Sequence, residues 1–383
     1  MKILVFAGTR PEAIKVAPVV LALRADGNCQ ALLCSSGQHR EMLAQALADF
    51  DLAPDRDLAV MQPGQSLASL SSRLFTEIDA LLDRERPDWI LVQGDTTTVM
   101  VAALCSFYRG IKVAHLEAGL RSFDLRAPFP EELNRRVAGI VADLHLAPTT
   151  TARDNLLREG VPEAQVLVTG NTVIDALLLI REKIRGDTSL LAPGLAEAVS
   201  RGRRIVLVTG HRRENFGDGF QNICRAIRLL ADRHEDVMFA YPVHLNPSVR
   251  EPVLRLLANH PRILLLEPAP YKSFIAMMDA ATLILTDSGG VQEEAPSLGK
   301  PVLIMREVTE RPEGVAAGVA RLVGTEEASI VSAVDGLLGD AEAYARMATC
   351  SNPYGDGKAA ERILSALLPG EVLPKQRGVP SAD

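Results

Sequence analysis

Residues 286–313, TDSGGVQEEAPSLGKPVLIMREVTERPE, decide the fold. The apolar run 283–285 before them is typical of a parallel strand buried on both faces. Gly289 and Gly290 then form a tight turn into a helix, so that free backbone N–H groups and the Ser288 hydroxyl favour a phosphate. Carboxylates in the helix's first turns can accept hydrogen bonds from a polyol such as ribose. The stretch therefore predicts a strand–turn–helix that binds a diphosphate and a sugar; the structural alternative is a tightly packed turn whose acids suit the helix dipole.

The same alternation of short apolar runs and helical-period segments continues along the whole chain. Strands are predicted at 3–6, 31–34, 89–92, 112–115, 144–147 and 166–168, and again at 205–208, 237–241, 263–266, 283–285 and 302–305. Helices are predicted between the strands, for example at 11–24, 41–50, 67–85, 97–108 and 131–142. This pattern predicts an α/β protein with two Rossmann-like, doubly wound domains.

The domain boundaries follow from the linker-like composition of 185–202, which places the junction between Gly170 and Gly202. We expect an N-terminal domain over 1–170 and a C-terminal domain over 171–357. A C-terminal helix near 358–369 is expected to pack back on the first domain. The Gly/Pro-containing tail, 370–383, is expected to fray.

Composition narrows the class of protein. The chain has 383 residues, 47% of them hydrophobic and 23% charged, with a net charge of −7. These values are ordinary for a soluble globular protein, and without a basic stripe they argue against a nucleic-acid partner. Five scattered cysteines without C-x-x-C spacing, a start that reads as a strand and the lack of a long apolar stretch predict a cytoplasmic protein outside the membrane.

Polar motifs follow the strands of the first half, where ligands bind in open α/β sheets. After the first strand, Arg10 and Lys15 near a helix start suit a pyrophosphate, although both could be surface cations. After the third, Asp95 could act as a helix N-cap or as an exposed carboxylate. After the fourth, the charge of Glu117 needs a partner, a raised pKa or a ligand. Glu131 starts a helix with a second acid behind a Pro-x-Pro loop.

Two histidines stand at comparable positions in the second half. His211, flanked by Arg212 and Arg213 before a glycine turn, is interpreted as an anion-site histidine or a general acid. His244 closes the next strand. Arg311 follows the last strand on the phosphate side. No His/Asp/Glu set shows metal-ligand spacing, and no G-x-S-x-G or Cys–His arrangement supports covalent acyl chemistry.

Taken together, these segments resemble the non-hydrolysing UDP-N-acetylglucosamine 2-epimerases. The matching stretches run in order through nearly the whole chain: GTRPEAIK, GQHREML, GDTTT, HLEAGLRS, PFPEELNR, GNTVIDAL, TGHRREN, PVHLNP, DSGGVQEEAPSLGKPVLIMR, TERPEG and NPYGDG. The resemblance implies two domains that face a cleft as in the B-type glycosyltransferases. It also implies a homodimer and no cofactor or metal.

By position, the resemblance also implies residue roles. Catalytic residues match Asp95, Glu117, Glu131 and His211. The UDP-binding residues match Arg10, Lys15, Phe274, Ser288, Gly289, Gly290, Glu294 and Arg311. In bacterial members a second UDP-GlcNAc acts as an activator, and part of that site matches Gln38, Arg212 and His244. Glu41 and Gly64 nearby are less typical of the most activator-dependent members.

One departure concerns the substrate. Many members read Arg-Thr-Gly and then Leu-Tyr-Ser-Pro, where this chain has Arg121-Ser122-Phe123 and Leu125-Arg126-Ala127-Pro128. Arg-Ser-Phe resembles the sister enzymes that epimerise UDP-diacetamido-uronic acids, and Arg126 could face a carboxylate. GTRPEAIK, PFPEELNR and TGHRREN fit the GlcNAc enzymes better. The predicted activity is C2 epimerisation of UDP-GlcNAc, with the uronic-acid substrate or a glycosyltransferase as alternatives.

Overall fold

The structure is a computed structural model that describes residues 1–37, 40–62 and 64–368. The chain forms two compact units, which are described separately. Of the described residues, unit 1 comprises Met1–Asp175 and 357–368, and unit 2 comprises Ala176–Asp356. The division falls within α7 (Thr172–Lys183). The predicted frayed tail, 370–383, lies outside the described residues.

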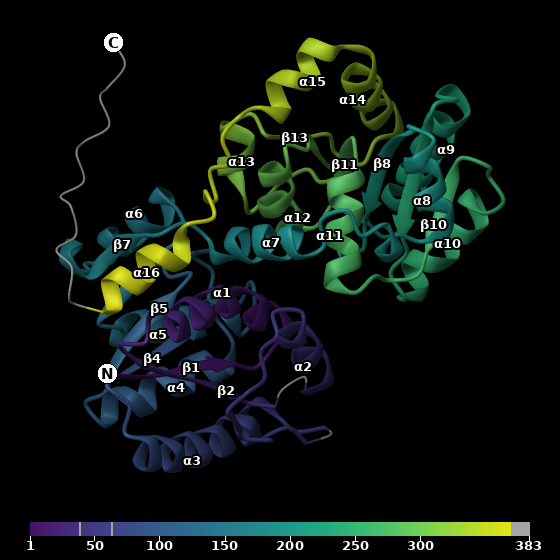
Figure 1. The fold of residues 1–383 in the computed structure, drawn as a ribbon. Helices are drawn as coiled ribbons and strands as arrows, with labels where there is room; N and C mark the ends of the chain where they lie inside the picture. The colour runs from purple at the N-terminus through teal and green to yellow at the C-terminus, as the bar shows by residue number, and fades with distance from the viewer. Residues whose placement is uncertain (38–39, 63, 369–383) are drawn as a thin grey trace, which may run out of the picture. The chain divides into compact units, whose positions relative to one another are not determined.

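Unit 1 is built on a parallel sheet in the order β3-β2-β1-β4-β5-β6-β7 (Figure 1). Its strands are β1 (Lys2–Ala7), β2 (Gln30–Ser35), β3 (Arg56–Asp57), β4 (Trp89–Gln93), β5 (Lys112–Leu116), β6 (Leu144–Ala147) and β7 (Val166–Val168). Helices connect them in sequence: α1 (Arg10–Asp26), α2 (Arg40–Ala48), α3 (Leu67–Glu85), α4 (Thr97–Tyr108), α5 (Glu131–Val141), α6 (Thr150–Arg158) and the short η1 (Glu163–Gln165).

Helices cover both faces of this sheet. On one face, α3, α4 and α5 pack side by side, and on the other α1 packs against α2 and α16 (Ala359–Leu367) (Figure 1). Burial on both faces explains the continuous apolar strands, because five of the six residues of β1 are buried. Asp175 accepts the backbone N–H groups of Ala359 and Ala360 at 3.3 and 2.8 Å, which fixes the start of α16 in unit 1.

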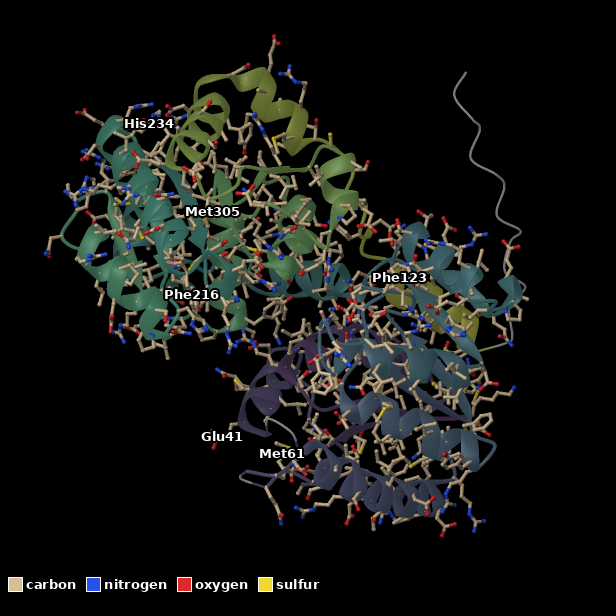
Figure 2. The ribbon with its side chains drawn as sticks, turned by 180° about the vertical axis from the view of Figure 1, so that it is seen from behind. Glu41, Met61, Phe123, Phe216, His234 and Met305 are labelled. Atoms are coloured by element: carbon tan, nitrogen blue, oxygen red, sulfur yellow. The ribbon has the colours of Figure 1, made fainter. Side chains whose placement is uncertain are left out.

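Unit 2 has a second parallel sheet in the order β10-β9-β8-β11-β12-β13. Its strands are β8 (Arg204–Thr209), β9 (Val237–Pro242), β10 (Ile263–Leu266), β11 (Leu283–Thr286), β12 (Val302–Ile304) and β13 (Ala320–Leu322). Its helices are η2 (Thr188–Leu190), α8 (Pro193–Ser200), η3 (Arg213–Asn215), α9 (Asp218–Arg233), α10 (Pro247–Leu257), α11 (Tyr271–Ala280), α12 (Gly289–Glu294), η4 (Ala295–Leu298), α13 (Pro312–Ala316), α14 (Glu327–Gly339) and α15 (Ala341–Ala348). Met305 lies in the core of this unit, and Phe216 packs against that core (Figure 2).

The structure confirms the predicted fold class of two doubly wound, Rossmann-like sheets. Every predicted strand is present, but β3 and β13 were not predicted. Both lie at a sheet edge, and their residues, Arg-Asp and Ala-Arg-Leu, form no apolar run in the sequence. Of the five cysteines, Cys34, Cys105 and Cys224 are buried and the other two half-buried, all as free thiols.

The strand order also locates the sites. In each sheet the order reverses at one point, between β1 and β4 in unit 1 and between β8 and β11 in unit 2. Ligands of open α/β sheets bind outside the carboxyl ends of the strands at such a switch point. Each unit therefore has one place where its polar loops are expected to act.

Candidate active site

In unit 1, the loops at the switch point are built around the turn from β1 into α1. Thr9 caps α1, and Glu12 completes a capping box by accepting the N–H groups of Gly8 and Thr9, each at 2.7 Å. The other carboxylate oxygen of Glu12 accepts the hydroxyl of Thr96 at 2.7 Å, so this acid joins the loops after β1 and β4. Burial raises the pKa of Glu12, and these hydrogen bonds oppose the rise. Arg10 is the half-buried first residue of the helix.

Glu117 is held tightly directly after β5. Lys15 donates to its Oε1 at 2.5 Å, Asn171 to the same oxygen at 3.3 Å, and Gln93 to Oε2. Its side chain is only 8% exposed. Its φ of 63° places a non-glycine residue in the left-handed region, a conformation that costs about 1 kcal/mol or more. The acid thus has its partner, Lys15, and a strained backbone of the kind that clusters at functional sites.

Asp95 lies beside this acid, and the structure rejects its reading as an N-cap. Thr96 is the N-cap of α4 instead, with its hydroxyl accepting the N–H of Val99. The Asp95 carboxylate pairs with Arg135 of α5. Burial raises the pKa of Asp95; Arg135 opposes that rise, and the negative charge of Glu117 adds to it. The two carboxylates therefore sense each other's charge.

The start of α5 contributes the remaining acids of unit 1. Glu131 is its half-buried first residue. The neighbouring Glu132 has 0% exposure and accepts the N–H of Ser122 at 3.0 Å. Phe123, labelled in Figure 2, has a φ of 62°, in the left-handed region that favours glycine.

In unit 2, His211 follows β8 and is organised by a buried acid, Asp287, at the end of β11. Asp287 Oδ2 accepts the backbone N–H of His211 at 2.9 Å and that of Arg212 at 2.8 Å, while Oδ1 lies 3.6 Å from His211 Nδ1. The His211 ring stacks on His244, with 5.3 Å between centroids. Burial lowers the pKa of His211, Asp287 opposes that shift, and His244 adds to it.

The glycine turn lies close to the loop that follows β8. Ser288 is the N-cap of α12, and its N–H donates to the hydroxyl of Thr286 at 2.9 Å. Gly289 is buried and Gly290 exposed. A Cβ added at Gly289 would lie 3.8 Å from Arg212, so the turn and the loop after β8 are close neighbours.

The two acids of α12 have different roles. Glu293 is buried and forms an ion pair with Arg311 that holds the Arg311 side chain in place. Glu294 accepts the hydroxyl of Tyr271 at 2.9 Å. Phe274, half-buried, lies one helical turn after Tyr271 on α11. Of these two acids, only Glu294 is predicted to contact the ligand, and that role stays a prediction.

Two of the three residues of the predicted activator site lie within the described residues. Gln38 lies outside the described residues. Arg212 and the exposed His244 meet at the His211 loop of unit 2, where Arg212 Nη2 is 3.8 Å from Glu310. Among the residues that the structure describes, no group of three or more His, Cys, Asp or Glu side chains is arranged to hold a metal ion.

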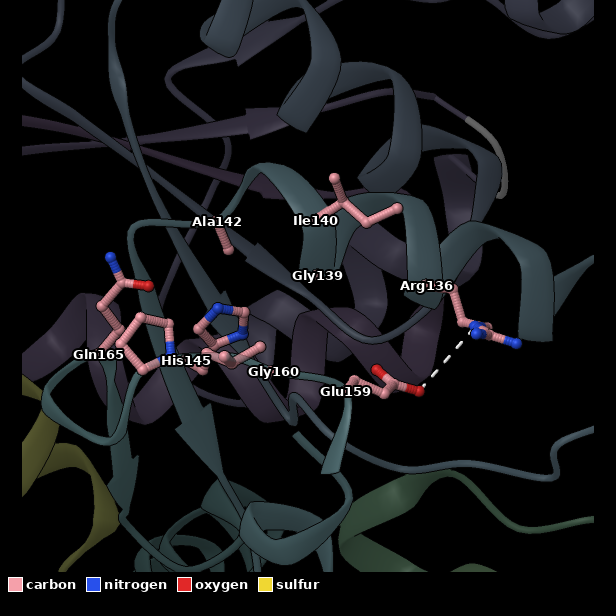
Figure 3. Close-up of a pocket in the computed structure, with 10 residues that line it drawn as sticks. Arg136, Gly139, Ile140, Ala142, His145, Glu159, Gly160 and Gln165 are labelled. Carbon is pink, nitrogen blue, oxygen red and sulfur yellow. Dashed lines mark ion pairs between the residues drawn. The ribbon is translucent and has the colours of Figure 1, made fainter. Parts of the chain in front are cut away.

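Unit 1 also has a hollow whose lining residues include none of the predicted site residues. It measures about 500 Å³ and is lined by α5, the start of β6 and the chain after α6 (Figure 3). Arg136 and Glu159, which line it, form an ion pair at 3.9 Å (Figure 3), and the buried His145 also lines it. Burial lowers the pKa of His145 to about 4, so this histidine is neutral near pH 7.

The two doubly wound sheets, each with polar residues at its switch point, define a two-domain protein with a GT-B-like fold. The family model described as UDP-N-acetylglucosamine 2-epimerase matches residues 21–368. A probable UDP-N-acetylglucosamine 2-epimerase of Ralstonia solanacearum is 54% identical, over 96% of this chain and 98% of its own. The UDP-N-acetylglucosamine 2-epimerase of Escherichia coli K12 is 51% identical over the same shares.

Solved structures of UDP-N-acetylglucosamine 2-epimerases share the fold of this chain. The UDP-GlcNAc 2-epimerase of Neisseria meningitidis, solved bound to UDP-GlcNAc, has a TM-score of 0.85 at 44% identity, covering 96% of this chain and 99% of its own. A putative UDP-N-acetylglucosamine 2-epimerase of Listeria monocytogenes has a TM-score of 0.90 at 44% identity, covering 96% and 95%. The chain belongs to the UDP-N-acetylglucosamine 2-epimerase family. Within the described ranges, no helix is both long and apolar enough to cross a membrane.

Sequence reasoning missed four residues that organise these loops: Glu12, Glu132, Arg135 and Asp287. For Glu12 the signal was present, because Thr9-x-x-Glu12 spells a capping box. The others leave no comparable signal. Apart from the Glu132–Arg135 pair within α5, the partners named here lie between 9 and 76 positions away along the chain, and only the fold brings them into contact.

Proposed function

We propose that this protein interconverts UDP-N-acetylglucosamine and UDP-N-acetylmannosamine in the cytoplasm by inverting C2. C2 has no adjacent carbonyl that could stabilise a carbanion. Removal of the C2 proton must therefore be coupled to departure of UDP from C1. The intermediate is then 2-acetamidoglucal, to which UDP adds back after a proton returns to the opposite face of C2. Such a route needs a group that retains UDP and proton-transfer groups on both sides of the ring.

The observation that carries the proposal is the pair of carboxylates in unit 1. Asp95 and Glu117 lie at the carboxyl ends of neighbouring strands, each with a cationic partner and each within the other's electrostatic field. Two acids whose environments differ are suited to accept and return a proton. We assign proton transfer to these two acids together with Glu131 and His211.

The nucleotide-binding residues are assigned within each unit from the family resemblance. Ser288 and the glycine turn, with Arg311 fixed by Glu293, bind the diphosphate, and Glu294 binds the ribose hydroxyls. Phe274 of unit 2 completes this set, with Arg10 and Lys15 from unit 1. The guanidinium and the backbone N–H groups would stabilise the charge that develops on UDP as the C1–O bond breaks.

One experiment separates this activity from its alternatives. Purified protein is incubated with UDP-GlcNAc alone in deuterated water, and the products are followed by proton NMR. The expected result is an equilibrium mixture of UDP-GlcNAc and UDP-ManNAc that carries deuterium at C2. Free ManNAc with UDP would indicate a hydrolysing enzyme, an absolute need for an acceptor would indicate a glycosyltransferase, and unlabelled product would exclude elimination and re-addition.

A second substrate class is favoured by one specific observation. Phe123 occupies a left-handed position where glycine would be relaxed, in the loop that also carries the exposed Arg126. A UDP-diacetamido-uronic acid carries a carboxylate that Arg126 could bind. Parallel assays with both UDP-sugars decide between them: kcat/KM higher for the uronic acid would reassign the substrate, and Arg126→Ala would then abolish that preference.

We further propose a homodimer and a second UDP-GlcNAc bound as activator. Exposed apolar side chains at the C-terminal ends of the neighbouring helices α4 and α5 offer a surface for a second copy: Phe107, Tyr108 and Ile140 are 58%, 71% and 82% exposed. Sedimentation of wild type and Ile140→Glu tests the dimer, and the variant is expected to be monomeric.

For the activator, we expect a sigmoidal dependence of the rate on UDP-GlcNAc concentration that becomes hyperbolic in His244→Ala.

A further inference from the structure

Glu132 is a buried acid that the proposed proton-transfer steps do not use. It lies in the first turn of α5, and its side chain has 0% exposure. A carboxylate is costly to bury unless other groups pair with it, and such groups then depend on it in turn. Glu132 contacts the loop after β5 on one side and Arg135 of α5 on the other.

The first contacts are with the loop after β5. Glu132 Oε2 accepts the N–H of Ser122 at 3.0 Å, and Oε1 accepts that of Phe123 at 3.3 Å. Phe123 has a φ of 62°, which a non-glycine residue adopts at a cost of about 1 kcal/mol or more. Glu132 therefore holds this strained loop, which begins at Glu117, against the start of α5.

The second contacts lead to Asp95. Glu132 Oε2 lies 3.5 Å from Arg135 Nη1, one turn further along α5, and Arg135 Nη2 donates to Asp95 Oδ2. Asn134 Nδ2 donates to the backbone oxygen of Asp95 at 2.9 Å. Two side chains of α5, Asn134 and Arg135, thus contact Asp95, and Glu132 contacts Arg135 as well.

We propose that Glu132 is a positioning residue for Asp95: it orients Arg135 and shares the positive charge that Arg135 presents to the Asp95 carboxylate. The inference rests on the proposed function, in which Asp95 exchanges the C2 proton. Glu132 itself touches no reacting atom in this assignment.

The shared charge makes a pH-dependent prediction. The charges that face Asp95 are Arg135 from α5, Glu117 after β5 and Lys15 from α1. Glu132→Gln removes the carboxylate that competes for Arg135, so more of the guanidinium's charge acts on Asp95. The pKa of Asp95 falls as a result, and the limb of the pH–rate profile that Asp95 titrates moves to lower pH.

The experiment compares kcat, KM and the pH–rate profile of wild type, Glu132→Gln, Arg135→Lys and a control. The control is Glu85→Gln, a side chain 6% exposed at the end of α3 that pairs with Lys2 at 2.6 Å and Arg56 at 2.7 Å. For Glu132→Gln we expect kcat to fall about tenfold, within the range for a misplaced catalytic group, with KM changed less than about twofold and the Asp95 limb shifted. The control should lose stability and keep kcat and the profile.

The outcomes are separable. A folded Glu132→Gln with the kcat and profile of wild type overturns the proposal. If that variant does not fold, Arg135→Lys decides, because lysine lacks the planar fork that presents one guanidinium nitrogen to each carboxylate. An unchanged kcat and profile in this variant would equally overturn the proposal. Failure of the proposed function appears elsewhere, as wild-type protein that forms no UDP-ManNAc or as Asp95→Asn with normal turnover.

Discussion

Replacing Glu117 by glutamine tests the proposed chemistry most directly. The substitution preserves the shape of the side chain but replaces the negative carboxylate, to whose oxygens Lys15, Gln93 and Asn171 donate. An amide has one acceptor oxygen in place of two, so its NH₂ group must face a donor that formerly had an acceptor. The change therefore removes a proton-transfer group and leaves polar atoms unsatisfied.

The structure sets the expected magnitudes. Loss of a general acid or base lowers turnover by roughly 10²–10⁴-fold. The Lys15–Glu117 pair spans 2.5 Å, with side chains 16% and 8% exposed, so it lies nearer to a buried pair than to a surface pair. Breaking a fully buried pair costs about 3–5 kcal/mol and a surface pair at most about 1; we expect about 2–3 kcal/mol here. For a domain of this size that corresponds to roughly 5–10 °C in Tm.

The assay measures three quantities on wild type and Glu117→Gln: kcat for UDP-ManNAc formation by NMR, Kd for UDP by calorimetry, and Tm. The Kd should stay within about threefold, because the diphosphate and ribose contacts are assigned mainly to unit 2 and Lys15 keeps its charge. Glu85→Gln again serves as the control, since it breaks a similar ion pair in unit 1 at 2.6 Å without touching an assigned site residue.

The reasoning is refuted if Glu117→Gln keeps turnover within about threefold of wild type while the variant is folded. It also fails if turnover falls in proportion to stability in both variants, since the loss would then report folding alone. A fall of at least about a hundredfold in Glu117→Gln with normal turnover in Glu85→Gln supports it.

Three further predictions concern the loops and the docking of α16. Asp287→Asn should lower the pKa of His211 further, because burial already lowers it and the opposing charge is removed; an NMR titration showing an unchanged or higher pKa would contradict this. Gly119→Ala should prevent stable folding or cost more than about 3 kcal/mol, because a Cβ there would lie 2.1 Å from Ala152 O at a φ of 88°, and a wild-type Tm would refute it. Asp175→Ala should cost about 2–3 kcal/mol by unpairing two backbone N–H groups of α16; the Kd for UDP should stay within about threefold, and a tenfold loss of UDP affinity would count against the assignment of nucleotide binding.

The sequence alone determined the architecture and most positions of the candidate site. Continuous apolar runs mark strands that are buried on both faces, and the polar residues directly after them must lie at the carboxyl edge of the sheet. For this reason Glu117, His211 and Ser288 could be placed before their surroundings were known. The edge strands β3 and β13 were not predicted because Arg-Asp and Ala-Arg-Leu form no apolar run, whereas the equally short β7, Val-Leu-Val, does.

Only the tertiary structure decided how these residues are held. In the structure Thr96 caps α4, and Asp95 pairs with Arg135 instead. Threonine and aspartate both cap helices, so the local sequence does not decide between them. The tertiary structure also separated the acids of α12, turning Glu293 toward Arg311. Propensity and periodicity act over a few residues, whereas hydrogen bonds and ion pairs depend on atoms within about 3–4 Å of each other in space, whatever their separation along the chain.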